Sequence, residues 1–257
     1  MRLALCQAAP TRGDVEGAFV RMDRMARAAA LSGADLLLLP ELYLPGYNRP
    51  GLHGPMAQPA CGEWIARAAE IARQAGCALC FGFAEKTPEG TRNSAMVLSA
   101  EGERIALYRK VQPFGPMEEA NFIPGEGYVA FDFKGRRLGL LICFDIEFPV
   151  HARRLAAAGV NLLLVPTANP AAYPHVQELL VPARAAENGI TVAYANYTGD
   201  DAGLAFGGGS VIAGPRGDIL ARAGSGEALL VTDLPDPDPA TAQHAPADRE
   251  RGDIPGP

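Results

Sequence analysis

Short apolar runs alternate with longer stretches of helical periodicity along most of the chain. Apolar residues recur at helical intervals over 15–31, and helices are also predicted at 63–75 and 181–188. Continuous apolar runs at 34–40 and 136–144 are typical of strands that are buried on both faces of a sheet. The alternation predicts an α/β protein in which helices cover the strands.

One pattern from the first half of the chain returns in the second half. Residues 33–40 and 159–166 both read Gly-x-x-Leu-Leu-Leu-x-Pro. This echo indicates two similar layers of strand and helix packed against each other. Beyond residue 234 the periodicity stops, and proline and charged residues dominate. We therefore expect one domain over 1–234 and a tail over 235–257 that is extended or loose.

The composition is that of an ordinary globular protein. Of 257 residues, 48% are hydrophobic and 20% charged, and the net charge of −6 comes without a basic stripe, which argues against nucleic acid or a membrane surface as a partner. No apolar run is long enough to span a bilayer, and residues 1–7 are too short for a signal peptide. Five scattered cysteines, an odd number, argue against a disulfide framework. We expect reduced thiols and a cytoplasmic protein.

Cys143 lies where an apolar strand gives way to polar residues, a position that often carries catalytic side chains in α/β proteins. The simpler reading is a small buried hydrophobe. A nucleophilic cysteine needs a base or a positive charge nearby, because its thiol is mostly protonated at neutral pH. The four histidines stand singly, mostly in loops and the tail, where we expect them to be solvated. Glu41 and Lys110 each follow a strand-like run and can supply the base and the cation.

Two other motifs carry less weight. Cys77 and Cys80 lie in an apolar strand pattern and lack the second cysteine pair of a zinc site, so we predict that both are core residues. The three glycines at 207–209 lack the spacing and the following lysine of a phosphate-binding loop, and they predict a tight backbone bend.

Three segments resemble the signatures of the nitrilase superfamily, and they occur in the same order. They are Pro40-Glu41, Tyr108-Arg109-Lys110 and residues 143–149 (Cys-Phe-Asp-Ile-Glu-Phe-Pro). Further similarity extends the resemblance from residue 1 to about residue 232. Members of this superfamily hydrolyse non-peptide carbon–nitrogen bonds, so the resemblance implies a carbon–nitrogen hydrolase domain over 1–234. It also implies a four-layer αββα sandwich, a homodimer or higher homo-oligomer, and no metal or organic cofactor.

The resemblance also implies a role for each charged residue of the expected site. Glu41 would act as general base and Cys143 as nucleophile, while Lys110 and the backbone N–H of Phe144 would hold the oxyanion.

A second glutamate is expected shortly before the Phe-x-Pro-Gly stretch at 122–125. Glu118 matches the usual spacing, and the adjacent Glu119 is the alternative. This residue would position substrate or water and help to raise the pKa of Glu41.

The residues around the expected pocket look most like those of amidases that act on small aliphatic amides, and 5-aminopentanamidase-type enzymes are the nearest. The expected substrate-binding residues are Tyr47, Phe114, Asn169 and Tyr173. An ω-amino amide would also need an acidic residue at the far end of the pocket. Its candidates are Asp145, Glu147 and Glu119.

Other functions stay open at this point. An N-carbamoyl amino acid or N-carbamoyl-amine hydrolase would share the same triad. A true nitrilase is disfavoured, because its cysteine is typically followed by Trp-Glu, whereas this chain has Phe144-Asp145. From a different class, the fold could serve as an inactive scaffold or binding subunit, but retention of all the charged positions argues against that.

Overall fold

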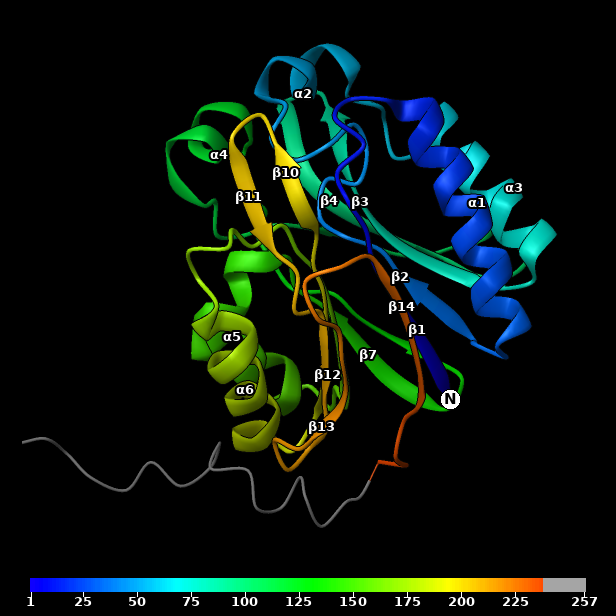
Figure 1. The fold of residues 1–257 in the computed structure, drawn as a ribbon, viewed down its shortest axis with the longest axis vertical. Helices are drawn as coiled ribbons and strands as arrows, with labels where there is room; N and C mark the ends of the chain where they lie inside the picture. The colour runs from blue at the N-terminus through cyan, green and yellow to red at the C-terminus, as the bar shows by residue number, and fades with distance from the viewer. Residues whose placement is uncertain (238–257) are drawn as a thin grey trace, which may run out of the picture.

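The computed structural model describes residues 1–237, which fold around two six-stranded sheets (Figure 1). In order across the first sheet, the strands are β14 (Ala228–Asp233), β1 (Arg2–Gln7), β2 (Leu36–Leu38), β3 (Ala78–Thr87), β4 (Gly90–Leu98) and β5 (Arg104–Arg109). Across the second sheet they are β13 (Ile219–Arg222), β12 (Val211–Ala213), β9 (Thr191–Ala195), β8 (Leu162–Pro166), β7 (Arg136–Leu140) and β6 (Ala130–Phe133). Of the predicted tail, residues 238–257 lie outside the described part of the chain.

The two sheets share a plan that explains the repeated sequence pattern. The first Leu-Leu-Leu run forms β2, which lies between the parallel strands β1 and β3. The second forms β8, which lies between the parallel strands β7 and β9. Antiparallel strands complete each sheet on both sides. The repeated pattern therefore marks the same central position in each sheet.

Helices cover the outer face of each sheet. The helices on the first sheet are α1 (Val15–Leu31) and α3 (Glu63–Ala75), and those on the second are α5 (Pro149–Ala157) and α6 (Val181–Asn188) (Figure 1). The side chain of Asp14 caps α1 by accepting a hydrogen bond from Gly17 N at 2.9 Å. Gly76 ends α3 in the left-handed conformation at φ 68°. The four-layer αββα sandwich is confirmed, and so are the predicted bounds of α1, α3 and α6.

Strand β2 is buried on both faces, as its continuous apolar run predicts. Leu36 and Leu38 belong to an apolar cluster that includes the second sheet, whereas Leu37 belongs to the cluster beneath α1 and α3. Cys80 in β3 and Cys77, which directly precedes β3, divide in the same way, with Cys80 in the first cluster and Cys77 in the second. Both are fully buried, which confirms the core prediction.

The predicted strand at 136–144 is wrong beyond Leu140, where β7 ends. Cys143 has φ 46°, a left-handed conformation that cannot continue a strand, and it begins the 3₁₀ turn η1 (Cys143–Glu147). The nucleophile candidate therefore lies on a sharp turn after the strand.

The expectation of solvated histidines is wrong for His53 and His151, which are both buried. The ring of His53 hydrogen-bonds to Gly46 O at 3.0 Å, and that of His151 to the Tyr128 hydroxyl at 2.6 Å. Each partner satisfies one ring nitrogen of its histidine that would otherwise be costly to bury, whereas Nδ1 of His53 is buried without a hydrogen-bond partner among the described residues.

Several short elements that the sequence pattern does not predict occupy the described chain. They are α2 (Pro50–Met56), α4 (Gly115–Asn121), the π-helical turn η2 (Val176–Leu180) and the hairpin of β10 (Thr198–Asp201) and β11 (Leu204–Gly207). In Figure 1, α2, α4 and the hairpin lie together at one end of the molecule. No helix within residues 1–237 is long and apolar enough to cross a membrane.

Candidate active site

The three residues of the expected triad follow strands that run in the same direction within their sheets. Glu41 comes after β2, and Lys110 comes directly after β5. Strand β5 runs in the same direction as β2, because β2 is parallel to β3 and two antiparallel pairings separate β3 from β5. Cys143 follows β7, a parallel neighbour of β8 in the second sheet. The segments after β2 and β8 meet where Glu41 N donates to Thr167 O at 3.3 Å. Strand ends from both sheets thus build one site.

Glu41 is fully buried, and its two carboxylate oxygens differ. Oε1 accepts hydrogen bonds from Asn93 Nδ2 and Lys110 Nζ, both at 2.7 Å. Oε2 is buried without a partner. Burial raises the pKa of Glu41 to about 7; the positive charge of Lys110 opposes this rise and the negative charge of Glu118 adds to it. The carboxyl group can therefore take up and release a proton near neutral pH.

Lys110 is buried between two carboxylates. Its Nζ donates to Glu41 Oε1 and to Glu118 Oε1, each at 2.7 Å. Burial by itself lowers the pKa of Lys110, but the charges of Glu41 and Glu118 outweigh burial and raise it. The residue is a fixed cation, and two of its three N–H groups are engaged.

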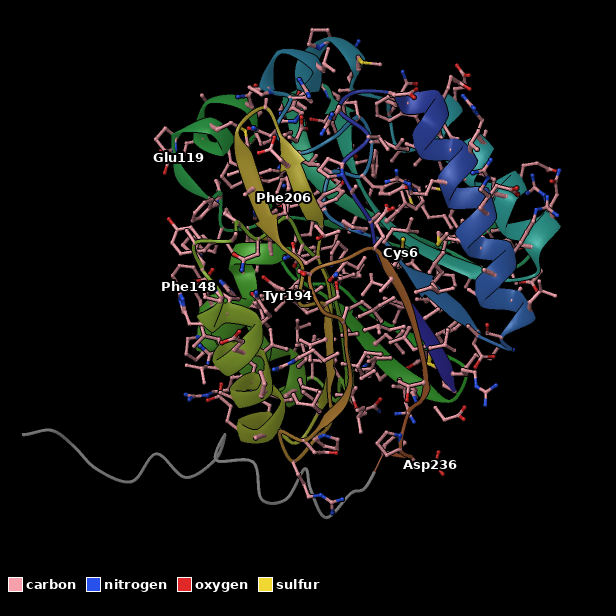
Figure 2. All side chains as sticks on the ribbon, in the orientation of Figure 1. Cys6, Glu119, Phe148, Tyr194, Phe206 and Asp236 are labelled. Carbon is pink, nitrogen blue, oxygen red and sulfur yellow. The ribbon has the colours of Figure 1, made fainter. Side chains whose placement is uncertain are left out.

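Glu118 lies on α4 and is fully buried. Besides the bond from Lys110, Oε1 accepts one from the Tyr47 hydroxyl at 2.8 Å, and Oε2 accepts one from Phe114 N at 3.1 Å. Glu119 is exposed and lies on the outer side of the same helix (Figure 2). Of the two candidates for the second glutamate, Glu118 is the one that reaches the buried cluster.

Cys143 is buried within electrostatic reach of these charges. Burial raises the pKa of its thiol well above the usual value, and the charge of Glu41 adds to the rise, while Lys110 and the backbone N–H of Ala168 lower it. The thiol is therefore neutral at rest and needs a base to become a nucleophile.

Asn93 is a functional candidate that the sequence reasoning missed. It lies within β4, donates to Glu41 and accepts a hydrogen bond at its backbone oxygen from Lys110 N at 2.9 Å. Both contacts help to fix the two charged residues. A signal was available, because the polar residues 91–94 lead directly into the apolar run 95–98 of the same strand, a pattern that indicates a buried polar network.

Aromatic rings surround the turn that carries Cys143. The ring of Phe144 lies 5.1 Å from that of Phe114 and 5.0 Å from that of Phe148, and Phe114 lies 5.8 Å from Tyr173. All three pairs have the edge-to-face geometry that aromatic rings favour. Tyr173 is exposed, so the aromatic group extends from the nucleophile's neighbour to the surface.

The side-chain amide of Asn169, an expected substrate contact, is hydrogen-bonded within the protein. Its amide group donates to Tyr173 O at 2.9 Å and to Gln177 Oε1 at 2.7 Å. Both side-chain N–H groups are thereby committed within the protein. In this arrangement Asn169 holds the segment that carries Tyr173.

The chain matches the carbon-nitrogen hydrolase family over residues 2–241. It is 43% identical over 238 residues to a Pseudomonas protegens protein named "Hydrolase in pqqF 5'region", covering 91% of this chain and 82% of that one. Over 235 residues it is 34% identical to an "(R)-stereoselective amidase" from Pseudomonas sp, covering 91% and 85% of the two chains.

Solved structures of the amidase from Nesterenkonia sp. AN1 are also similar to the chain, at 40% identity. A variant showing Michael addition of acrylamide at the active-site cysteine has a TM-score of 0.89 and covers 97% of this chain and 96% of that one. Another variant, in complex with butyramide, has a TM-score of 0.85 with 94% and 92% covered.

A two-sheet αββα sandwich with a cysteine beside a buried carboxylate–lysine cluster defines a hydrolase of non-peptide carbon–nitrogen bonds. The chain belongs to the carbon-nitrogen hydrolase family and is an amidase of the nitrilase superfamily.

Proposed function

We propose that the protein hydrolyses a small aliphatic amide to a carboxylic acid and ammonia through a thioester on Cys143. This proposal rests on the hydrogen bonding of the two carboxylate oxygens of Glu41. One of its oxygens is held by Lys110 and Asn93, while Oε2 is buried without a partner and is free to take a proton.

In the proposed acylation step, Glu41 Oε2 accepts the proton of the Cys143 thiol, and the sulfur attacks the amide carbonyl carbon. The carbonyl electron pair moves onto oxygen to give a tetrahedral oxyanion. When this intermediate collapses, the carbon–nitrogen bond breaks and the departing ammonia takes the proton from Glu41. A thioester on Cys143 remains.

In the proposed deacylation step, Glu41 takes a proton from water, and the resulting hydroxide attacks the thioester carbonyl. Collapse of the second tetrahedral intermediate breaks the carbon–sulfur bond and releases the acid, and the thiol regains its proton. A pKa of about 7 suits a carboxyl group that must act as base and acid in turn.

The oxyanion would be held by Lys110 and the backbone N–H of Phe144. Lys110 uses two of its three N–H groups on Glu41 and Glu118, which leaves one for the substrate. Phe144 directly follows the nucleophile, the position from which a backbone N–H reaches the oxyanion in other hydrolases. Each such donor typically contributes a factor of about 100 to 1,000 in rate.

The aromatic surroundings support an apolar acyl group. Phe114 and Tyr173 form part of the aromatic group beside the Cys143 turn, and the hydroxyl of Tyr47 is held by Glu118. We propose that these three residues line the acyl pocket and that Asn169 acts through the Tyr173 segment. The Nesterenkonia amidase in complex with butyramide is a similar protein holding an amide of this class.

An ω-amino amide such as 5-aminopentanamide is the second candidate substrate. Of the three acidic residues considered for its ammonium group, Glu119 is exposed, and both oxygens of Asp145 accept hydrogen bonds within the protein. Glu147 is half-buried and directly precedes Phe148 in the chain, and burial raises its pKa. We propose Glu147 as the partner if the ω-amino amide is the substrate.

Ammonia release tests the proposed function. Wild-type protein and Cys143→Ala are compared on propionamide, butyramide, 5-aminopentanamide, an N-carbamoyl amino acid and an aliphatic nitrile. Release by wild type alone, fastest from the simple amides, is the expected result. Preference for the N-carbamoyl compound, with carbon dioxide as a second product, would assign the alternative hydrolase activity. Equal release by Cys143→Ala, or no release from any compound, would overturn the proposal.

A further inference from the structure

A single buried carboxylate connects the segment that carries Lys110 to the turn that carries Cys143. Asp145 is fully buried, and both of its oxygens accept hydrogen bonds. Oδ2 accepts from the Tyr108 hydroxyl at 2.8 Å and from Ile142 N at 2.9 Å, and Oδ1 accepts from Gln112 N at 2.9 Å.

The positions of these donors in the chain are informative. Tyr108 and Gln112 lie two residues before and two residues after Lys110, so Asp145 holds the lysine segment on both sides. Ile142 directly precedes Cys143, and Asp145 itself lies two residues after it. The carboxylate therefore holds the backbone next to both Lys110 and Cys143. It takes no part in the proposed proton transfer and does not contact the proposed oxyanion.

The backbone of Cys143 needs such a constraint. Its φ of 46° is in the left-handed region, which is strained for a residue other than glycine and persists only where the surroundings impose it. The hydrogen bond from Ile142 N to Asp145 closes the turn around this residue, and a second bond, from Asp145 N to Ile142 O at 3.1 Å, closes it again.

From this geometry we infer that Asp145 is a positioning residue, which fixes the Cys143 turn relative to Lys110 so that thiol and cation meet the same substrate carbonyl. The inference rests on the proposed roles of Cys143 and Lys110. Misplacement of reacting groups by about 1 Å can cost a factor on the order of 100 in rate. Loss of Asp145 should therefore affect the chemical step more than substrate binding.

Two substitutions test the inference. Asp145→Asn keeps the shape of the side chain but replaces one accepting oxygen by an NH2 group, which cannot accept a hydrogen bond from the donors around it. We expect kcat to fall by on the order of 100-fold with little change in KM. Tyr108→Phe removes one of the three donors and keeps the ring, so its effect on kcat should be in the same direction and smaller. Asp132→Asn is the matched control, because Asp132 is exposed and its side chain accepts hydrogen bonds from Arg137, away from the buried cluster.

The double variant distinguishes positioning from a general loss of structure. If Tyr108 acts through Asp145, adding Tyr108→Phe to Asp145→Asn should lower kcat by less than Tyr108→Phe does alone. Circular dichroism and thermal melting show what fraction of each variant is folded at the assay temperature. Unchanged kcat in folded Asp145→Asn, or a fall that only matches the loss of folded protein, would overturn the inference.

Failure to fold and failure of the proposed function can each be distinguished from failure of the positioning role. If Asp145→Asn does not fold, Tyr108→Phe decides, and unchanged kcat in that variant would contradict the inference. If wild type releases no ammonia from any amide, the proposed function has failed, whereas an active wild type with an equally active Asp145→Asn rejects the positioning role alone.

Discussion

Glu41, Lys110 and Glu118 form a chain of alternating charges in which each neighbour changes the chemistry of the next. Lys110 donates to both carboxylates, and Glu118 raises the pKa of Glu41 by its negative charge, after the larger effect of burial. The cluster therefore keeps the proposed base able to hold a proton near neutral pH.

Glu118→Gln should move the acid limb of the pH profile for kcat/KM to lower pH. The substitution removes a negative charge that raises the pKa of Glu41, so Glu41 should ionise at lower pH. The measurement is kcat/KM for propionamide between about pH 5 and pH 9. Glu119→Gln is the matched control and should leave the profile unchanged, because Glu119 is exposed. An acid limb that moves to higher pH in Glu118→Gln would contradict the assignment.

At the residue scale, sequence reasoning could identify the charged candidates but not their arrangement. The sequence predicts Glu41, Lys110 and Cys143 because each lies at the end of a strand-like run, and it predicts Glu118 by resemblance. The left-handed backbone of Cys143 could not be predicted, because it depends on contacts of Asp145 with residues more than 30 positions away. Asn93 is distant from Glu41 in sequence, and only the sheet brings them together.

Two glycines bring the backbone close to the charged residues, Gly82 within β3 and Gly125 in the segment between α4 and β6. A Cβ atom on Gly82 of β3 would lie 2.7 Å from Glu41 Cα, and one on Gly125 would lie 2.8 Å from the carbonyl carbon of Arg109, next to Lys110. Both neighbours are backbone atoms, which cannot move aside without shifting a candidate catalytic residue. These glycines allow the segments of Glu41 and Lys110 to pack in place.

Gly82→Ala should lower kcat and should destabilise the fold by about 1 to 3 kcal/mol, because the added methyl group displaces the Glu41 segment. Thermal melting and propionamide hydrolysis measure the two effects. Gly127→Ala is the matched control, because no atom lies within 4 Å of its added Cβ, and it should change stability by no more than about 0.5 kcal/mol. Equal behaviour of the two variants would show that the close approach at Gly82 has no consequence.

Elements with strong periodicity were predictable, and short ones near the site were not. Residues 15–31 and 63–75 carry several turns of helical pattern and gave the observed bounds of α1 and α3. In contrast, α4 has seven residues, too few for a helical pattern to be distinguished, and it is held by tertiary contacts such as that of Glu118 with Lys110. The β10–β11 hairpin is similarly short and follows β9 without a long loop.

At the scale of the whole molecule, the repeated Leu-Leu-Leu pattern predicted two similar layers, and the two sheets bear this out. The strand order could not be read from the sequence, because β14 pairs with β1 across almost the full length of the described chain. Strands that pair across so many residues leave no pattern in the local sequence that predicts the pairing.

The homo-oligomer implied by the resemblance is a prediction about the whole molecule. The chain has a mass of 27.0 kDa, and light scattering coupled to size-exclusion chromatography should give at least twice that value. A mass equal to that of one chain at all concentrations tested would contradict this prediction. The measurement does not depend on knowing the substrate.

The most direct test of the central claim is a search for the acyl-enzyme. Wild-type protein is mixed with propionamide, quenched in acid during turnover and examined by intact-protein mass spectrometry, and peptides then locate any adduct. The account predicts a gain of one propionyl group on Cys143, and no gain in Cys143→Ala. Steady ammonia release with no propionyl adduct under any quench condition, or an adduct on another residue, would contradict it.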